Sequence, residues 1–403
     1  MSEKKNWVTR WDEVPQREEV KLDDKPWFHG KIAREEAERL LEPWRTGTFL
    51  VRESTHYVGD YTLCVCIDSR VEHYRVILDH RKLTIDEEEY FTSLPELVSH
   101  YSEDADGLVS RLITPVVSQK RDGGYSSQFE KAGWSIERNQ ITAGRVIGRG
   151  NFGEVRKGSY QGQDVAIKVM KDDKLQSQSF LAEASIMTQL RHPNLVQLIG
   201  VSSGASLWIL LEFMSKGNLL DYLRSRGRSV VRKIDQIKFS INIASGMMYL
   251  EEKKFVHRDL AARNILVSDE DIAKVSDFGL AQHDRDLVEK SKIPVKWTAP
   301  EAVRNKHYST KSDVWSYGIL LWELYSFGRV PYPRVPADNV IVFVEDGSRM
   351  QPPDDCPDSI FDVMLKCWEL NPTKRPTFSS IQRRLEDLKR QLLTDTKKME
   401  TDF

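Results

Sequence analysis

The chain has 403 residues, of which 40% are hydrophobic and 30% are charged, and its formal net charge is −2 at pH 7. A chain of this length exceeds what one hydrophobic core usually supports, so we expect two or more domains. The near-zero charge provides no overall field that would attract nucleic acid or a membrane surface. No apolar stretch approaches the roughly 20 residues of a membrane span, and the charged amino terminus argues against a secretory signal.

The four cysteines lie at positions 64, 66, 356 and 367. Cys64 and Cys66 alternate along a run that reads as a strand and form no CxxC pair, which favours packing roles in a reducing compartment over a disulfide framework. Residue 2 is Ser2, so the N-myristoylation pattern is absent. These features favour a cytoplasmic protein.

Apolar periodicity and turn residues divide the chain into five segments. Residues 1–26 are polar and charged, and we expect a flexible segment there. Residues 27–115 combine short β-like runs with one helix near each end, and residues 116–140, with their Gly-Gly and Ser-Ser pairs, read as a linker. Residues 141–392 begin with strands and continue with long amphipathic helices, and residues 393–403 form a tail. Within the first folded unit we expect helices over 35–41 and 94–101 and strands over 48–52, 61–67 and 73–78.

The run HRDLAARN, residues 257–264, is the most informative motif of the chain. It places Asp259 five residues ahead of Asn264, which is the spacing of the catalytic loop of protein kinases. In that loop the acid accepts the proton of the acceptor hydroxyl and the amide holds a magnesium ion. The arginine at position 263 resembles the pattern of tyrosine kinases, and this resemblance implies that Arg263 neutralises the loop near Asp259 and helps to fix the acceptor.

A glycine-rich motif, Gly148, Gly150, Gly153 and Val155, fits the pattern G-x-G-x-x-G-x-V. Glycines let the backbone approach phosphate oxygens and present N–H donors to them. A Rossmann turn has the same spacing but is followed directly by a helix. Here a strand-like run continues to Tyr160, so we expect a hairpin between two strands.

Lys168 follows the glycine motif at the distance found in kinases, and Glu183 lies fifteen residues further on in a predicted helix. The resemblance implies that Lys168 bridges the nucleotide phosphates and pairs with Glu183. Asp277, in Asp-Phe-Gly, would hold the metal ion together with Asn264. The cofactors implied are ATP and Mg²⁺, with Mn²⁺ as an alternative. The ATP site would also include Ile147, Ala166, Glu212, Met214 and Leu266.

Residues 294–301, PVKWTAPE, end the predicted activation segment and also resemble tyrosine kinases. A bulky platform of this kind supports a tyrosine ring. Glu301 is expected to pair with Arg375, and Asp313 is expected to be a buried acid that holds the backbone of the catalytic loop. These three acidic and basic residues are interpreted as architectural.

Arg52 stands inside an apolar strand, where an arginine is costly to bury without a partner. Trp27 to Gly30 precede it and His73 to Arg75 follow it, and together these motifs resemble an SH2 domain. The resemblance implies a bidentate pair between Arg52 and phosphotyrosine. The other phosphotyrosine-binding residues implied are Arg34, Ser54, Thr55 and His73.

The overall resemblance therefore implies an α+β fold. An SH2 domain, with a central antiparallel sheet flanked by two helices, would be followed by a bilobal protein kinase with a β-rich N-lobe and a helical C-lobe. No tyrosine occurs between Asp277 and Glu301 or after Phe378. These absences, with the motifs above, resemble the C-terminal Src kinase (Csk) family, which phosphorylates the inhibitory tail tyrosine of Src-family kinases. That family carries an SH3 domain of roughly 60 residues before its SH2 domain, and the 26 residues ahead of Trp27 are too few for one.

Arg224, Arg226 and Arg228 form a basic cluster after the hinge that the sequence predicts at residues 212–214. They fit either a solvated helix end or a docking patch for an acidic substrate surface. The family resemblance implies a monomeric, cytoplasmic non-receptor tyrosine kinase, recruited to membranes by phosphotyrosine-containing scaffold proteins and promoted by its SH2 domain. Two alternatives are an SH2–pseudokinase adaptor and another SH2–tyrosine kinase with different substrates.

Overall fold

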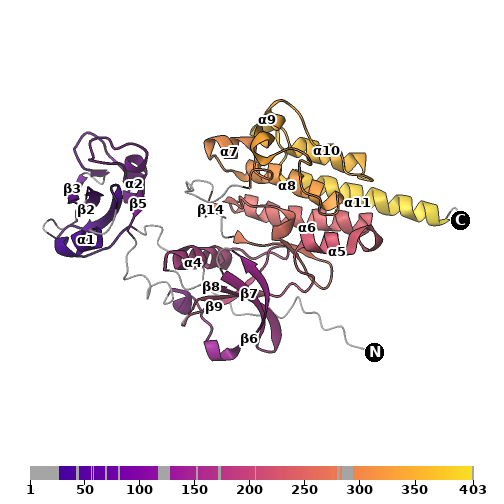
Figure 1. Cartoon of the computed structure of the whole chain (residues 1–403), viewed down its shortest axis with the longest axis horizontal. Helices are drawn as coiled ribbons and strands as arrows, with labels where there is room; N and C mark the ends of the chain where they lie inside the picture. The colour runs from indigo at the N-terminus through magenta and orange to yellow at the C-terminus, as the bar shows by residue number, and fades with distance from the viewer. Residues whose placement is uncertain are drawn as a thin grey trace. The chain divides into compact units, whose positions relative to one another are not determined.

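The computed structural model describes residues 27–41, 45–55, 57, 59–68, 70–79, 82–116, 128–150, 153–170, 174–204, 206–278, 282–283 and 294–401. They fall into two compact units, one within residues 21–128 and the other within residues 129–403 (Figure 1). The predicted flexible segment 1–26, most of the linker and most of the activation segment lie outside the described residues.

The first unit is a sheet with one helix on each face. Its strand order is β4-β3-β2-β1-β5. Helix α1 carries glutamates in its first turn and Arg39 in its last, the arrangement that the helix dipole favours. Helix α2 begins at the cap Ser93, whose side chain accepts a hydrogen bond from the Glu96 amide. The elements are α1 (Arg34–Leu41), β1 (Thr48–Glu53), β2 (Tyr61–Ile67), β3 (Arg70–Asp79), β4 (Lys82–Thr84), α2 (Leu94–Glu103) and β5 (Thr114–Pro115).

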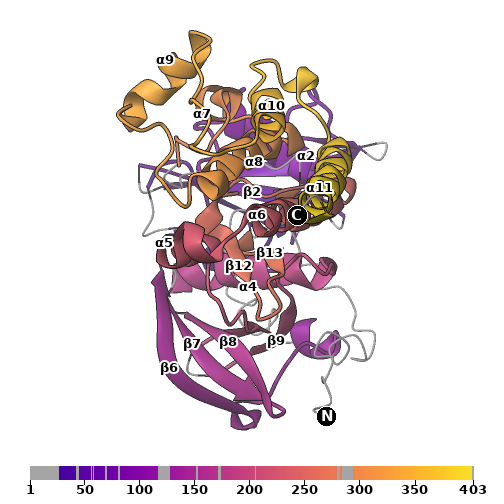
Figure 2. The ribbon, with the colours of Figure 1, turned by 90° about the vertical axis from the view of Figure 1, so that its right-hand side faces the viewer.

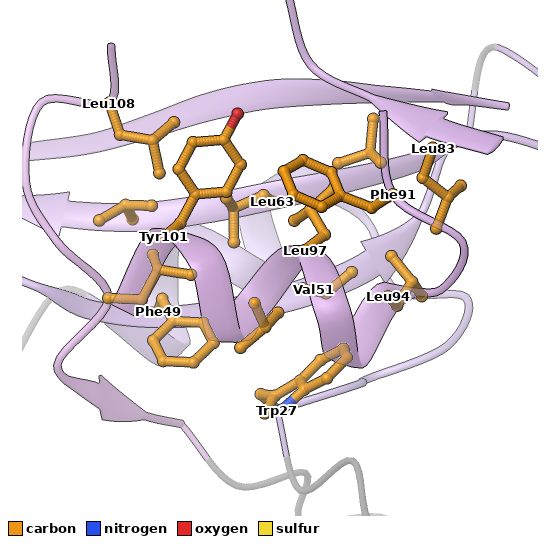
Figure 3. Packing of buried hydrophobic residues seen from close by; sticks show 14 residues of the cluster. Trp27, Phe49, Val51, Leu63, Leu83, Phe91, Leu94, Leu97, Tyr101 and Leu108 are labelled. Carbon is orange, nitrogen blue, oxygen red and sulfur yellow. The ribbon is translucent and has the colours of Figure 1, made fainter. Parts of the chain in front are cut away.

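The sheet is antiparallel except at its last edge, where β5 runs parallel to β1. Alternating residues of β1 and β2 separate two apolar cores. Phe49, Val51 and Leu63 face α2 and form one cluster with Tyr101 of that helix, as Figure 3 shows. Leu50 and Cys64 face α1. The expected antiparallel sheet flanked by two helices is therefore confirmed.

The second unit begins with the end of the predicted linker. Phe129 is buried, and the backbone of Trp134 accepts a hydrogen bond of 2.8 Å from the Val201 amide. Ile136 donates to the Val201 carbonyl at 2.9 Å. Residues 129–140 are thus tied to strand β9 (Leu198–Ser202) and belong to the kinase-like unit.

A five-stranded sheet of order β6-β7-β8-β10-β9, joined by helix α4, forms the small lobe (Figure 2). Its strands are rich in β-branched residues, and Val165, Ile167 and Leu210 form its core. The elements are η3 (Arg138–Gln140), β6 (Ile141–Gly150), β7 (Gly153–Tyr160), β8 (Gln163–Met170), α4 (Lys174–Gln189), β9 (Leu198–Ser202) and β10 (Trp208–Glu212).

The large lobe is helical and is built around α8, in which every residue from Ser312 to Tyr325 is buried. Ser309 and Ser312 form a capping box at its start. The main elements are α5 (Leu219–Val230), α6 (Lys233–Glu252), α7 (Pro300–Asn305), α8 (Thr310–Tyr325), α9 (Val340–Glu345), α10 (Asp358–Cys367) and α11 (Phe378–Thr401). Shorter elements are β11 (Phe255–Val256), η4 (Ala262–Asn264), β12 (Ile265–Val267), β13 (Ala273–Val275), β14 (Gln282–His283), η6 (Ala337–Asn339) and η7 (Pro372–Lys374).

Residues 393–401, expected as part of a separate tail, continue helix α11. The four cysteines all lie in the described part of the chain and form no disulfide, and Cys64, Cys66 and Cys367 are buried, in line with packing roles. Among the helices that the structure describes, none is both long enough and apolar enough to cross a membrane.

Candidate active site and anion-binding pocket

The glycine motif forms the expected hairpin between β6 and β7. Gly150 pairs with Gly153, and Gly148 pairs with Val155. Gly153 has φ +152°, and a Cβ atom there would lie 1.9 Å from the carbonyl oxygen of Val169. Only glycine fits this close approach, so the hairpin presents a bare backbone where the sequence predicts phosphate binding.

Lys168 lies in β8 and pairs in register with Val155 of β7, so it lies beside the strand that leaves the glycine hairpin. Its Nζ lies 2.7 and 2.8 Å from the two carboxylate oxygens of Glu183 in α4, and 3.5 Å from Oδ1 of Asp277. Burial opposes the charged ammonium, but the charges of Glu183 and Asp277 outweigh it and raise the pKa of Lys168. The three residues predicted at separate points of the sequence are therefore brought together.

The residues predicted to surround adenine lie around the junction of the lobes. Ala166 pairs with Leu211, the residue before Glu212 at the end of β10. The Glu212 carboxylate accepts a hydrogen bond of 2.7 Å from Nζ of Lys274, so the Glu212 side chain helps to fix the hinge. Ile147 is 44% exposed, as expected for a residue that borders an open site. Leu266 lies in β12, and Met214 is buried at the end of the predicted hinge.

The catalytic loop brings its three predicted residues into contact. The Asn264 amide donates to Oδ2 of Asp259 at 2.8 Å and to its backbone oxygen at 2.7 Å. The Arg263 guanidinium donates to Oδ1 of Asp259 and lies over the ring of Trp297, 4.8 Å from its centroid. The carboxylate thus has both oxygens oriented, and one of its partners touches the predicted acceptor platform.

A single buried carboxylate holds the start of this loop. Asp313, which is 1% exposed, accepts the backbone N–H groups of His257, at 2.7 Å, and Arg258, at 3.0 Å. Burial raises the pKa of Asp313 to about 6, against the stabilising effect of these bonds. His257 is bonded in turn to the carbonyl oxygen of Ser276, at 3.0 Å, which ties the catalytic loop to the segment that carries Asp277.

Asp277 adopts φ +68°, and its side chain is 52% exposed beside Lys168. The donors at this point are oxygen atoms, from the Asp277 carboxylate and the Asn264 amide, and hard cations such as Mg²⁺ prefer oxygen ligands. The residues therefore fit a divalent cation of this type.

The predicted architectural pair is present, because Arg375 contacts both carboxylate oxygens of Glu301, at 2.5 and 2.9 Å. Sequence reasoning missed Glu323 in α8. It is 1% exposed, and its Oε2 accepts the N–H groups of Ala262 and Trp297, each at 2.9 Å. An acidic residue in the apolar run of residues 319–324 is the signal that could have identified it.

In the first unit, Arg52 is 5% exposed in β1, and its Nε is buried without a hydrogen-bond partner. Its Nη1 donates to the carbonyl oxygen of Glu53, at 3.4 Å, and the guanidinium also interacts with the thiol of Cys64. A buried guanidinium with an unsatisfied donor is unfavourable unless a ligand satisfies it. The surroundings of Arg52 therefore fit the predicted role of an anion-binding residue.

His73 lies beside this site and links β3 to α1. Its Nδ1 lies 3.2 Å from the Sγ of Cys64, and its Nε2 lies 3.1 Å from Glu38. The Glu38 carboxylate also accepts a hydrogen bond of 2.8 Å from Nε of Arg34. Burial lowers the pKa of His73, and the Arg34 and His73 hydrogen bonds lower the pKa of Glu38. Sequence reasoning missed Glu38.

Ser54 and Thr55, the other predicted phosphate contacts, follow β1 directly, and Thr55 is exposed. The Ser54 hydroxyl accepts the Tyr57 amide at 3.1 Å, so it shapes the loop after the strand. The structure places both residues at the carboxyl end of the strand that carries Arg52.

The three arginines of the predicted docking patch differ in their surroundings. Arg224 is exposed, but its Nε donates to the Gly328 carbonyl oxygen at 2.8 Å. Helix α5 is kinked at Gly227, which has φ 60°, and Arg228, beyond the kink, pairs with Asp355. Arg226 is exposed and projects from the helix before the kink.

Comparison with known proteins agrees with this geometry. The family model for protein tyrosine and serine/threonine kinases matches residues 141–385, and the SH2 domain model matches residues 27–101. The chain is thus an SH2-containing protein tyrosine kinase.

Several relatives extend over most of the chain. Megakaryocyte-associated tyrosine-protein kinase of Mus musculus is 49% identical over 367 residues, which cover 91% of this chain and 72% of the relative. The protein of the same name from Rattus norvegicus is 48% identical, with 92% and 80% covered. Tyrosine-protein kinase csk-1 of Caenorhabditis elegans is 47% identical, with 90% and 72% covered. The chain belongs to the C-terminal Src kinase family.

Proposed function

We propose that this kinase transfers the γ-phosphoryl group of ATP to the inhibitory C-terminal tail tyrosine of Src-family kinases. The observation that carries the proposal is the tyrosine-free segment between Asp277 and Glu301 in a chain with an otherwise complete catalytic set. Phosphorylation of a tyrosine within this segment can order it in a kinase, and this chain has no tyrosine there to phosphorylate. The family relationship supports the same substrate class.

A protein kinase uses ATP and a divalent metal ion. In the proposed site Asn264 and Asp277 would hold Mg²⁺, which would neutralise charge on the phosphate oxygens. Lys168, oriented by Glu183, would bind phosphate oxygens as a cation. The glycine hairpin covers the phosphates, and the remaining proposed contacts for ATP are Ile147, Val155, Ala166, Glu212, Met214 and Leu266.

Asp259 orients the acceptor hydroxyl and accepts its proton, and its two oxygens are kept in place by Arg263 and Asn264. Phosphoryl transfer depends mainly on positioning and charge stabilisation, so these fixed contacts account for the main contribution of the protein. Arg263 stacks on Trp297, and this contact joins the catalytic loop to the platform that is predicted to support the ring of the acceptor. The contact therefore supports a tyrosine acceptor.

The SH2 domain implies phosphotyrosine-containing partners. We propose that Arg52 binds the phosphate with a fork of two N–H donors, assisted by Arg34, Ser54, Thr55 and His73. Such partners would recruit the kinase from the cytoplasm to membrane-associated scaffold proteins. Binding would also promote catalysis through the segment around Trp134, whose backbone pairs with β9.

The substrate is tested by incubating the protein with ATP, Mg²⁺ and a catalytically inactive Src-family kinase, followed by mapping of the phosphorylated tyrosine by mass spectrometry. Labelling of the tail tyrosine is expected. Labelling of the activation-loop tyrosine instead would contradict the proposed substrate and favour a different kind of SH2–tyrosine kinase. If neither the inactive Src-family kinase nor a poly-Glu-Tyr peptide is labelled in the presence of ATP, the adaptor alternative is favoured.

A further inference from the structure

Glu323 is an acid placed in the most buried helix of the large lobe. It is 1% exposed, and apolar residues precede and follow it in α8. Burial raises its pKa, whereas hydrogen bonds from Ala262 and Trp297 and the charges of Arg263 and Arg224 lower it. A buried carboxyl group is costly, and partners of this quality are needed to keep it there.

Its two carboxylate contacts join segments that are far apart in the sequence. The same oxygen, Oε2, accepts the backbone N–H of Ala262, inside the catalytic loop, and the indole N–H of Trp297, in the acceptor platform, each at 2.9 Å. A single atom therefore sets the distance between the catalytic loop and the platform.

Trp297 is held from a second direction. The guanidinium of Arg263 lies 4.8 Å from the centroid of its ring, and the same guanidinium donates to Asp259. Rotation of the indole would displace the surface on which Arg263 rests, and with it one of the two groups that orient Asp259. The residues on the nucleotide side, Lys168 and Glu183, pair with each other in the small lobe.

We propose that Glu323 is a positioning residue for the acceptor tyrosine, because its carboxylate fixes Trp297 against the catalytic loop and thereby sets the orientation of Arg263 and Asp259. This inference rests on the proposed transfer to protein tyrosine. Its consequence is specific, because loss of the contact should impair use of the acceptor and leave the use of ATP unchanged.

The same residue is linked through its backbone to helix α5. The Gly328 amide donates to the Glu323 carbonyl oxygen at 2.8 Å, and the Gly328 carbonyl oxygen accepts Nε of Arg224 at 2.8 Å. Gly328 has φ +81°, and a Cβ there would lie 3.0 Å from Cγ of Arg224. The end of α8 is thus fitted to α5, which stabilises the position of Glu323 along the helix.

Two variants remove the contact from opposite ends. Trp297→Phe keeps an aromatic ring under Arg263 and removes only the N–H donor, whereas Glu323→Leu removes the acceptor and keeps a side chain of similar size. The matched control is Glu345→Leu in α9, which removes a half-exposed carboxylate paired with Arg304. Steady-state kinetics with a poly-Glu-Tyr peptide would be measured for full-length proteins, with melting temperatures alongside.

We expect each variant to lower kcat/KM for the peptide about tenfold while KM for ATP stays within about twofold. The double variant should be no worse than the more impaired single variant, because both substitutions remove one hydrogen bond. If Glu323→Leu does not fold, Trp297→Phe alone decides the question.

Three results would overturn the proposal: additive losses, an equal rise of KM for ATP, or unchanged acceptor kinetics with a lower melting temperature only. The last of these would make Glu323 a purely structural acid. If the unsubstituted protein phosphorylates no tyrosine peptide, the proposed function fails as well, and this is seen before any variant is compared.

Discussion

The ammonium group of Lys168 lies within 2.8 Å of both carboxylate oxygens of Glu183, and Asp277 lies 3.5 Å from it on another side. One cation therefore connects β8, α4 and the segment after β13. The side chains of Lys168 and Glu183 are 15% and 5% exposed, so the pair is largely removed from solvent. A desolvated pair of this kind is better understood as a device that defines one active arrangement than as a source of stability.

Lys168→Met should reduce phosphotransfer by roughly 10²–10³-fold or more, because the site would lose the cation that Glu183 orients. The protein should remain folded, since methionine fills a similar volume and Glu183 can take up a proton. Peptide phosphorylation and circular dichroism measure the two effects. Lys157→Met, which removes a half-exposed lysine paired with Asp164 in the neighbouring strand, is the control. Normal turnover by Lys168→Met would remove the assignment.

Arg52→Lys should weaken binding of a phosphotyrosine peptide about tenfold or more, because an ammonium group is a point charge and cannot reproduce a fork of two donors. Isothermal titration calorimetry with the peptide and its unphosphorylated form gives the comparison. Arg111→Lys provides a control at an exposed arginine that donates to the Glu103 carbonyl. Equal affinities of Arg52→Lys and the unsubstituted protein would exclude Arg52 as the phosphate ligand.

Arg226→Glu should reduce phosphorylation of an intact Src-family kinase severalfold and leave short peptides unaffected, because a docking surface acts only on a large partner. Arg226 is the clearest probe of the proposed patch. Substitution of Arg224 would also break its bond to Gly328, and Arg228 is already paired with Asp355. Arg384→Glu, an exposed arginine of α11, is the charge-matched control. A parallel loss on protein and peptide would refute docking at this surface.

Asp313 should give the folding stability an unusual pH dependence. Its folded pKa of about 6 lies above the ordinary value of 3.8, so the folded state binds more protons between these values and stability falls as pH rises through this window. The unfolding free energy of the unsubstituted protein minus that of Asp313→Asn should therefore decrease by about 1 kcal/mol between pH 5 and 6.5. Urea denaturation at several pH values measures this difference. An increase over the same range would show that the folded pKa lies below the ordinary value.

Much of the fold could be predicted because its signals are local. The strand over 61–67 has the predicted bounds, and the helices begin or end within a few residues of those expected. The parallel pairing of β5 with β1 could not be predicted, because a two-residue strand carries no periodicity and its position depends on the packing of the whole sheet.

The proximity of Lys168, Glu183 and Asp277, and that of Asp259 and Asn264, could be predicted because the motifs that carry them are contiguous and their spacing follows from the chemistry of phosphate binding. Glu38 and Glu323 were not identified, because each acts through partners that are distant in the sequence. Glu38 looks like an ordinary solvated helix residue until His73 is brought beside it. The docking arginines form a cluster in sequence, but the kink at Gly227 and the contacts of Arg224 and Arg228 make them three different groups in space.

The attachment of His257 and Arg258 to Asp313 has a consequence for motion between the lobes. Because α8 carries Asp313, the catalytic loop is fixed to the core of the large lobe, whereas Lys168 and the glycine hairpin are carried by the small lobe. Opening of the hinge would lengthen the distance between Lys168 and Asp277 and leave the contacts of Asp259 with Arg263 and Asn264 intact. The acid would then stay aligned throughout the cycle, and nucleotide exchange would require only the small lobe to move.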